Sequence, residues 1–430
     1  MSVTAIIFLT FVGLLLIGAP ITLSLGAAAM WAMYVSGKPL EGLVEIAYTS
    51  VNSFPIMALP AFILSGALME SAGISKRLVA VAEALAGPFT GGMAASTILS
   101  CLFFGAISGS GPATTAAVGM LMIPAMVRHG YHRGYAGAIT SSSGGLGVVI
   151  PPSIPMVIYG VAASESIADL FIAGFIPGLM LAVGLMTMNY FRSRQREYKG
   201  DGNTLSLKNI KDTMREGFWA LLTPVIILGG IYTGFFTPTE AAIISIFYTL
   251  FVGIFIYKEI ELKAAMKALE NTTWITGRVL IIMFTALAFG QFLTINKIPD
   301  LIAQGLLNLT DNLYLIWALV IVFLLFMGMF METLATIMLV TPVLLPVMVS
   351  FGVDPIHFGV VLVCCCEIGF ATPPLGENMF IASGVAGTTL EDISVNALPF
   401  VFVSVLVVFL IAYFPALTLW LPNLFNTFVQ

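Results

Sequence analysis

Four short segments contain the residues of this chain that could bind small ions and acids. They are 108–117 (SGSGPATTAA), 145–153 (GLGVVIPPS), 331–339 (METLATIML) and 369–378 (GFATPPLGEN). Hydroxyl groups, and carbonyl oxygens released where a helix unwinds, are hard ligands that suit a small cation such as Na⁺. A helix that restarts after such an interruption presents free N–H groups that attract anions. The four segments therefore predict neighbouring cation and anion sites.

The surroundings of these segments are apolar enough to predict a membrane protein. The chain has 430 residues, of which 59% are hydrophobic and 9% charged, and its mean hydropathy is +1.03. Soluble domains carry about 25% charged residues. The apolar runs have helical length and lack the alternation of an outer-membrane barrel. We therefore predict an all-α polytopic membrane protein whose interrupted helices line a cavity, because unsatisfied backbone groups in lipid cost several kcal/mol each.

The two halves of the sequence match each other at an offset of 222 residues. Many of the matched residues are Gly or Pro, which punctuate membrane helices. The matched pairs are Ala113/Ala335, Thr114/Thr336, Pro124/Pro346, Gly130/Gly352, Gly137/Gly359, Gly147/Gly369, Pro151/Pro373, Pro152/Pro374 and Pro177/Pro399. A gapless series of this kind predicts an internal structural repeat.

Charged residues indicate that the two repeats are inverted. Segment 192–217 holds seven of the seventeen Lys and Arg residues, which places it in the cytoplasm and makes it the joint between the halves. The turn 127–134 contains Arg128 and Arg133, whereas its counterpart in the second half, 349–358, contains neither Lys nor Arg. Equivalent turns are therefore expected on opposite sides of the membrane.

Each half is predicted to contain two spans, an interfacial helix, a third span, a second interfacial helix, a re-entrant hairpin, a broken helix and a final span. The hairpins are expected at 92–127 and 313–349, and the mixed-charge interfacial helices at 38–53 and 259–273. The corresponding division of the chain is 1–91 (first scaffold segment), 92–191 (first transport-domain half), 192–217 (cytoplasmic linker), 218–312 (second scaffold segment) and 313–430 (second transport-domain half and final helix).

Few charged residues fall at membrane depth. Glu332 lies at the second hairpin tip, where it could anchor hydrogen bonds, take part in cation or proton coupling, or face water only. Glu367 and Glu377 flank the second Pro-Pro segment. Arg278 is grouped with a basic segment expected at the cytoplasmic surface; an arginine that snorkels into the binding site is the alternative. The remaining polar candidates are predicted to have no chemical role: His129, His132 and His357 in surface turns, and Cys101, Cys364, Cys365 and Cys366 as packing residues.

The chain resembles the large membrane subunit of tripartite ATP-independent periplasmic (TRAP) transporters of bacteria over its full length. The resemblance rests on GAISGSGPATTAAVG and GLGVVIPPSIPMVIYG in the first half, and on METLATIMLVTPVLLPV and FATPPLGENMFIASGVAG in the second. It implies an elevator-type transporter in the bacterial inner membrane, with a mobile transport domain inside a fixed scaffold. It further implies uptake of an organic acid, of sialic acid or C4-dicarboxylate type, coupled to Na⁺.

The resemblance also implies partners and ligands. A periplasmic binding protein would deliver the substrate, and a small four-helix membrane subunit would bind the scaffold; no nucleic acid is expected. Two or more Na⁺ sites are implied, one at Ser108, Ser110, Gly145, Val148 and Pro151, and another at Gly328, Gly369, Thr372 and Leu375. The substrate carboxylate is expected near Ser108, Thr114, Thr333, Thr336 and Asn378.

Three other functions are compatible with parts of the sequence. The first is a stand-alone dicarboxylate or citrate carrier of similar fold that needs no binding protein. The second is an intramembrane serine protease, but the Gly spacing around Ser108 does not match that motif and the histidines are expected at surfaces. The third is a channel, which the inverted symmetry and the absence of a carbonyl-ring filter disfavour. We therefore expect a transporter and no enzymatic activity.

Overall fold

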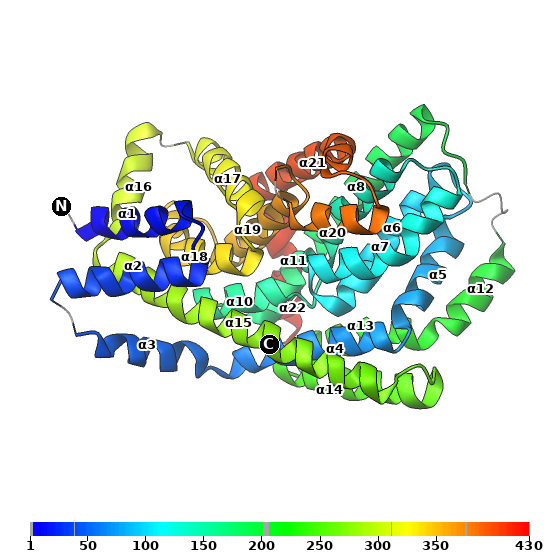
Figure 1. Cartoon of the computed structure of the whole chain (residues 1–430), viewed down its shortest axis with the longest axis horizontal. Helices are drawn as coiled ribbons and strands as arrows, with labels where there is room; N and C mark the ends of the chain where they lie inside the picture. Colours follow the sequence, from blue (N-terminus) through cyan, green and yellow to red (C-terminus); the bar gives the residue numbers. More distant parts are fainter. Residues whose placement is uncertain (1–2, 38, 201–205, 311, 375, 430) are drawn as a thin grey trace.

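The structure is a computed structural model that describes residues 3–37, 39–200, 206–310, 312–374 and 376–429. The described residues form helices joined by short loops, without a β-strand (Figure 1). Seven helices are long and apolar enough to cross a membrane, or up to nine if each of two bent helix pairs counts as one span. The prediction of an all-α polytopic membrane protein is confirmed.

The first half consists of short helices, one hairpin, one broken helix and one long final helix. In chain order its helices are α1 (Val3–Leu16), α2 (Ile21–Val35), α3 (Glu41–Val51), η1 (Phe54–Met57), α4 (Ala58–Ser71), α5 (Ile74–Ala86), α6 (Gly92–Ser108), α7 (Gly111–Arg128), α8 (Arg133–Gly144), α9 (Leu146–Val149), α10 (Ile154–Ala163) and α11 (Ile167–Gln195). The linker helix α12 (Leu207–Glu216) follows.

The second half repeats this order. Its helices are α13 (Phe218–Tyr232), α14 (Pro238–Phe251), η2 (Val252–Ile256), α15 (Leu262–Ile295), α16 (Ile298–Leu309), α17 (Leu313–Phe330), α18 (Thr333–Ser350), α19 (Pro355–Phe370), α20 (Glu377–Ala386), α21 (Leu390–Tyr413) and α22 (Ala416–Val429). The helix starts at 111 and 133 recur at 333 and 355, which is the offset of 222 residues found in the sequence.

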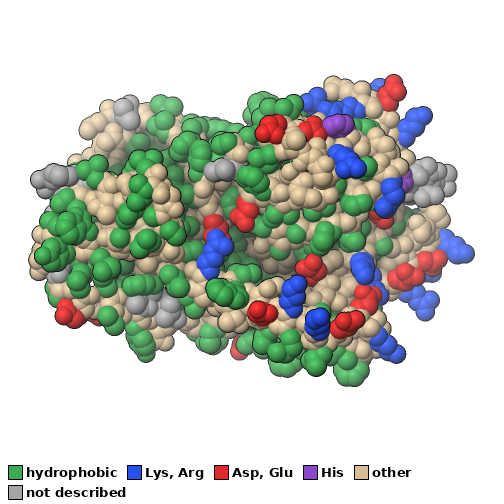
Figure 2. All heavy atoms as spheres, in the orientation of Figure 1, with side chains coloured by type: hydrophobic (Ala, Val, Ile, Leu, Met, Phe, Trp, Pro, Cys, Tyr) green, Lys and Arg blue, Asp and Glu red, His purple; other side chains and the backbone are tan. Residues whose placement is uncertain are grey.

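The two repeats are inverted, as the charge pattern predicts. Figure 1 shows the hairpin α6–α7 entering from one end of the molecule and the hairpin α17–α18 from the other, so that both tips meet near the centre. The helix α5 and its counterpart α16 likewise lie at opposite ends. Figure 2 shows Lys and Arg side chains gathered at the end that contains α5 and α12, which is the end assigned to the cytoplasm.

One predicted element differs between the halves. In the first half the short helix α3 is separate from the span α4, as expected for an interfacial helix. In the second half the expected separate helix at 259–273 is wrong, because α15 runs without interruption for 34 residues. Pro55 breaks the first-half segment, whereas no Pro lies within Leu262–Ile295 to stop that helix. This difference places three residues of α15, Ile275, Arg278 and Val279, in the site described next.

Candidate functional site

The first hairpin tip is held together by its own hydroxyl groups. Helix α6 ends at Gly109, whose φ of 62° lies in the left-handed region that favours glycine. Ser110 caps α7 by accepting a hydrogen bond from the Ala113 N–H at 3.4 Å. The Thr114 hydroxyl donates to the Ser110 carbonyl at 2.8 Å and lies 2.8 Å from the Ser108 hydroxyl. The tip therefore pairs the hydroxyls of Ser108, Ser110 and Thr114 locally, leaves the buried Thr115 hydroxyl without a partner among the described residues, and carries no charge.

The first tip lies against the first interruption. The carbonyl of Gly109 accepts a hydrogen bond from the Ile154 N–H at 3.2 Å, across a separation of 45 residues in sequence. Ser153 caps the restarting helix α10 by accepting from the Met156 N–H at 3.2 Å. The SGSG tip is thus bonded through its backbone to the first residue after GLGVVIPPS.

The second hairpin tip depends on charged partners from other helices. Glu332 occupies the cap position of α18, yet its side chain does not cap that helix. Instead its Oε2 accepts a hydrogen bond from Arg278 Nη2 of α15 at 2.8 Å. The hydroxyl of Thr333 donates to Oε1 of Glu367, in α19, at 2.9 Å. Both tips therefore restart a helix, but only the second is tied to neighbouring elements by charge.

Both tips and both interruptions border one cleft with a volume of about 200 Å³. The N-termini of α7 and α18 face this cleft, which places two positive helix ends beside it. Its lining residues are Ile63, Gly109, Ser110, Gly111, Pro112, Val148, Ile154, Pro155, Ile275, Arg278, Val279, Glu332, Thr333, Leu334, Glu367, Phe370 and Glu377. The two halves of the sequence thus converge on a single cavity.

Arg278 lies at the cleft, the alternative position given for it in the sequence analysis. Arg278 lines the cleft and pairs with Glu332 at the second tip. The uninterrupted helix α15 explains this position, because sixteen residues beyond Leu262 correspond to an axial rise of about 24 Å. Grouping Arg278 with Lys263 and Lys267 assumed that the helix ended before it. The side chain of Arg278 is 68% exposed, so its guanidinium is accessible from the cleft.

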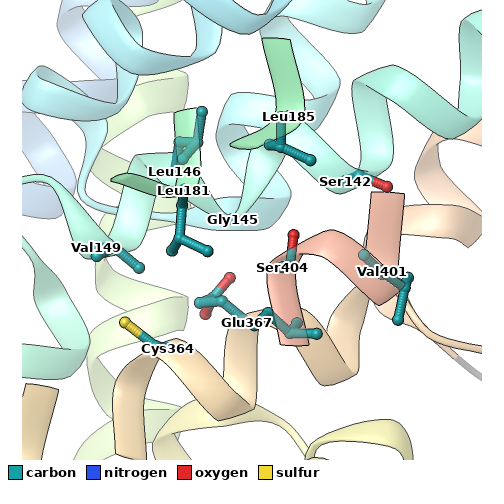
Figure 3. Close-up of a pocket in the computed structure, with 12 residues that line it drawn as sticks. Ser142, Gly145, Leu146, Val149, Leu181, Leu185, Cys364, Glu367, Val401 and Ser404 are labelled. Carbon is teal, nitrogen blue, oxygen red and sulfur yellow. The ribbon is translucent and has the colours of Figure 1, made fainter. Parts of the chain in front are cut away.

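A second, smaller cavity of about 20 Å³ lies behind the cleft, between the interruptions and the long helices α11 and α21 (Figure 3). Glu367 lines both cavities. Figure 3 shows its side chain rising from α19 toward Leu181 and Gly145. The carboxylate is therefore part of the wall that separates the two spaces, and its residue is only 3% exposed.

The residues predicted for the first ion site lie around this wall. Ser110 and Val148 line the cleft, Gly145 lines the small cavity, and Ser108 and Pro151 are buried beside them. The structure thus collects all five residues around the first tip and the first interruption.

The residues predicted for the second ion site lie where the hairpin arm α17 crosses the end of α19. A Cβ built on Gly369 would lie 2.5 Å from the carbonyl carbon of Gly328, so the two backbones touch. The Thr372 hydroxyl donates to the Ile368 carbonyl at 2.6 Å. Leu375 falls outside the described residues.

The predicted substrate residues divide into two groups. Thr333 lines the cleft. Ser108, Thr114, Thr336 and Asn378 are not among the lining residues, although they are buried as Thr333 is. Two functional candidates, Arg278 and the carboxylate of Glu367, were not among the predicted site residues, although both are charged residues in apolar runs.

Two further predictions concern His and Cys. His357 is buried, not in a surface turn: its ring nitrogens lie 2.8 Å from the Thr418 hydroxyl and 3.2 Å from the Ala412 carbonyl oxygen. The sequence prediction placed His357 in a turn, whereas helix α19 begins at Pro355 with Asp354 as its N-cap and therefore contains His357. The four cysteines are buried free thiols, as expected. Among the described residues, no group of three or more His, Cys, Asp or Glu is arranged to hold a metal ion.

Comparisons with known proteins point to one family. Residues 8–417 match the model of the tripartite ATP-independent periplasmic transporter, DctM component. The chain is 43% identical over 416 residues to the isethionate TRAP transporter permease protein DctMQ of Oleidesulfovibrio alaskensis, covering 96% of this chain and 66% of that protein. It is 38% identical to the C4-dicarboxylate TRAP transporter large permease protein DctM of Pseudomonas aeruginosa, covering 93% of this chain and 94% of that protein.

A sialic acid relative and two solved structures complete the comparison. The sialic acid TRAP transporter large permease protein SiaM of Vibrio cholerae is 36% identical, with 98% of both chains covered. The structure of the Alcanivorax borkumensis YdaH transporter has a TM-score of 0.62 at 16% identity and covers 96% of this chain and 98% of that one. The structure of Neisseria gonorrhoeae MtrF has a TM-score of 0.58 at 14% identity and covers 86% and 83%. These two structures share the fold.

Proposed function

Because the chain belongs to the DctM family of TRAP transporter large membrane subunits, we propose that it drives Na⁺-coupled uptake of an organic acid through the cleft between its hairpin tips. Members of this family are multi-pass inner-membrane permeases that take up organic acids, and they are not enzymes. We further propose that Na⁺ is the coupling ion, that the substrate passes through this cleft, and that it is an acid of the sialic acid, C4-dicarboxylate or sulfonate type.

The observation that carries the proposal is the position of Arg278 beside two helix N-termini. A guanidinium forms paired hydrogen bonds with a carboxylate or a sulfonate. The N–H groups that begin α7 and α18 also attract negatively charged groups. In the structure the partner of Arg278 is Glu332, at the tip of the second hairpin. A substrate anion would compete with Glu332 for Arg278 and so loosen the contact between α15 and the hairpin.

The donor atoms near the tips suit Na⁺. The Ser108, Ser110 and Thr372 hydroxyls and the backbone oxygens at both interruptions are hard ligands. The close approach of Gly328 to Gly369 leaves no room for a Cβ and brings two sets of backbone carbonyls together. We propose one Na⁺ at Ser108, Ser110, Gly145, Val148 and Pro151, and another at Gly328, Gly369, Thr372 and Leu375. Bound Na⁺ would add positive potential beside the substrate.

Transport would follow an elevator cycle with partner proteins. The two hairpins and the two broken helices would move together as a transport domain, while α15 and the outer helices remain fixed. The Arg278–Glu332 pair, which joins these two groups of helices, would form in one state of that cycle. A small four-helix subunit would bind the fixed helices, and a periplasmic binding protein would deliver the acid; fused relatives such as DctMQ support a membrane partner.

Uptake into proteoliposomes tests the proposal. The chain, reconstituted with a TRAP small subunit and a periplasmic binding protein, should accumulate the acid only with an inward Na⁺ gradient. Equal uptake in buffer containing K⁺ as the only alkali cation would refute the coupling. Uptake without the binding protein, at the same rate, would favour the second candidate, a stand-alone carrier.

A further inference from the structure

Two buried polar side chains behind the cleft have unused ligand atoms. Oε2 of Glu367 has no hydrogen-bond partner among the described residues, and neither Oδ1 nor Nδ2 of Asn378 has one. Glu367 is 3% exposed and Asn378 is fully buried. A buried polar group without a partner costs about 1–3 kcal/mol, and an unpaired buried charge costs more. Two such unpaired groups close together indicate that a ligand binds between them.

Glycine brings these two side chains to the first hairpin tip. A Cβ built on Gly111 would lie 2.5 Å from Glu367 Oε2 and 3.4 Å from Asn378 Nδ2. A Cβ built on Gly145 would lie 3.7 Å from the same carboxylate oxygen. The carboxylate is thus surrounded by backbone of the first tip and the first interruption, with Asn378 next to it. Only residues without side chains leave this space around Oε2 open.

Neighbouring charges do not neutralise Glu367. None of the ion pairs found among the described residues includes it, and the nearest basic residue of the cleft, Arg278, is engaged by Glu332. Glu377, which lines the same cleft, adds negative charge. Thr333 donates to Oε1 only. The remaining oxygen therefore faces an environment that attracts a cation.

We propose that Glu367 Oε2 and Asn378 Oδ1 form a charged Na⁺ site beside the first carbonyl site proposed above, with the Asn378 amide turned so that Oδ1, and not Nδ2, faces Gly111. An anionic carboxylate and an amide oxygen are hard ligands, and the backbone near Gly111 and Gly145 is the adjacent source of further oxygens. Because Glu367 also accepts from Thr333, an ion here would hold both hairpin tips against α19. The inference rests on the proposed Na⁺ coupling and adds a third ion with its own charge-neutralising ligand.

A thermal-shift titration of the purified full chain tests the site directly. Melting temperatures are measured from choline chloride to NaCl at constant ionic strength and pH. Na⁺ should raise the wild-type Tm, because a ligand that binds only the folded state stabilises it. Glu367→Gln removes the charge at nearly constant shape, so its Tm in choline should equal or exceed the wild-type value, and its half-saturating Na⁺ concentration should rise about tenfold or more.

Matched variants make the result decisive. Glu391→Gln removes the same charge at an exposed first turn of α21 and should keep the wild-type Na⁺ response. Asn378→Ala keeps the carboxylate and should also weaken Na⁺ binding, so it decides the matter if Glu367→Gln fails to fold. An unchanged Na⁺ titration in the folded variants would overturn the site. If the Tm of the wild type changes with pH by the same amount in choline chloride and in NaCl, Glu367 binds a proton and not Na⁺, and the site is overturned.

Uptake separates this inference from the proposed function. If wild-type uptake needs no Na⁺, the proposed function itself fails. If wild-type uptake needs Na⁺ and Glu367→Gln lowers the Hill coefficient for Na⁺ by about one, the third ion is supported. If wild-type uptake needs Na⁺ and the variant has the same Hill coefficient and half-saturating Na⁺ concentration, only the Glu367 site is refuted.

Discussion

The two hairpin tips occupy equivalent positions in the repeat and share one hydroxyl-to-carbonyl bond, from Thr114 to Ser110 and from Thr336 to Glu332, but their other side-chain partners differ. The first tip bonds to itself through Ser108, Ser110 and Thr114. The second tip bonds outward, through Glu332 to Arg278 and through Thr333 to Glu367. Backbone symmetry therefore extends only in part to side-chain chemistry. In the proposed elevator cycle, the uncharged tip would keep one structure, whereas the charged tip would exchange partners as its neighbours move.

The largest effect is expected from a substitution that adds a side chain to the first tip. Position 111 is glycine at the first tip, while its equivalent is Thr333. Gly111→Val would drive a methyl group into the Glu367 carboxylate, 2.5 Å from the Cβ position. We expect uptake to fall by at least about 100-fold, which corresponds to about 2.7 kcal/mol, and stability to fall by about 1–3 kcal/mol.

Uptake by proteoliposomes and the thermal midpoint of the purified chain measure these two effects. Gly384→Val is the control, since no atom lies within 4 Å of a Cβ built there. Near-normal uptake in Gly111→Val would show that the first tip tolerates a side chain as the second one does.

Removing Arg278 should act on the charged tip alone. Arg278→Gln removes the guanidinium proposed to bind the substrate anion, so we expect the KM of uptake to rise about tenfold or more, or about 1.4 kcal/mol. Arg278→Lys should recover part of this loss, because it keeps the charge but not the paired geometry. Stability should change by less than about 1 kcal/mol, because the pair is partly exposed.

Initial-rate kinetics over a range of substrate concentrations measure the change in KM. Arg128→Gln, which removes an exposed arginine at the end of α7, is the matched control. An unaltered KM in Arg278→Gln would remove the arginine from the substrate site.

Single hydroxyl deletions compare the two bonding patterns directly. Thr333→Val leaves Oε1 of buried Glu367 without its donor, which should destabilise the protein by about 1–3 kcal/mol. Ser108→Ala should cost less than about 1 kcal/mol, because Thr114 keeps its hydrogen bond to the Ser110 carbonyl. Chemical denaturation of both variants in the same detergent tests the order. Equal losses of stability would mean that the bond from Thr333 to Glu367 contributes no more than the bonds within the first tip.

The smallest expected effect concerns the loop that joins α10 to α11. Partial burial raises the pKa of Glu165 above its ordinary value of 4.5, and the nearby charges of Asp354 and Asp169 raise it further. An acid with a raised pKa in the folded state retains its full contribution to stability below the ordinary value and loses it as the pH rises through the raised value. Glu165→Gln should therefore stabilise the protein near neutral pH, by less than about 0.5 kcal/mol after solvent screening.

Thermal midpoints at about pH 4 and pH 7 measure this dependence. The variant should match the wild type at the lower pH and exceed it at the higher one. A gain of the same size at both would contradict an electrostatic origin, and Glu391→Gln controls for loss of a carboxylate elsewhere.

Much of this architecture could be predicted because Gly and Pro mark it locally. The hairpins at 92–127 and 313–349 differ by at most one residue at each end from α6–α7 and α17–α18, and both Pro-Pro segments interrupt helices. The short lengths of the hairpin arms and the charges of the turns sufficed for their orientation. These features depend on residues close in sequence, so a single sequence contains them.

The parts that could not be predicted depend on contacts between distant segments. Arg278 and Glu332 are 54 residues apart, and their pairing follows from how far α15 continues before it ends. The approach of Gly111 to Glu367 joins the two halves, and no local pattern encodes it. His357 was misplaced because its burial depends on packing against Thr418, in the last helix.

The length of α15 ties the site to the thickness of the lipid bilayer. Its 34 residues span about 51 Å, well beyond the roughly 30 Å of hydrocarbon in a typical membrane. A helix this long must tilt or extend into the headgroup layers, and its tilt follows the thickness of its surroundings. Since Arg278 lies midway along it, a change in acyl-chain length would swing the guanidinium relative to the second hairpin. Lipid composition would thereby change the strength of the pair between Arg278 and Glu332 at the second hairpin tip.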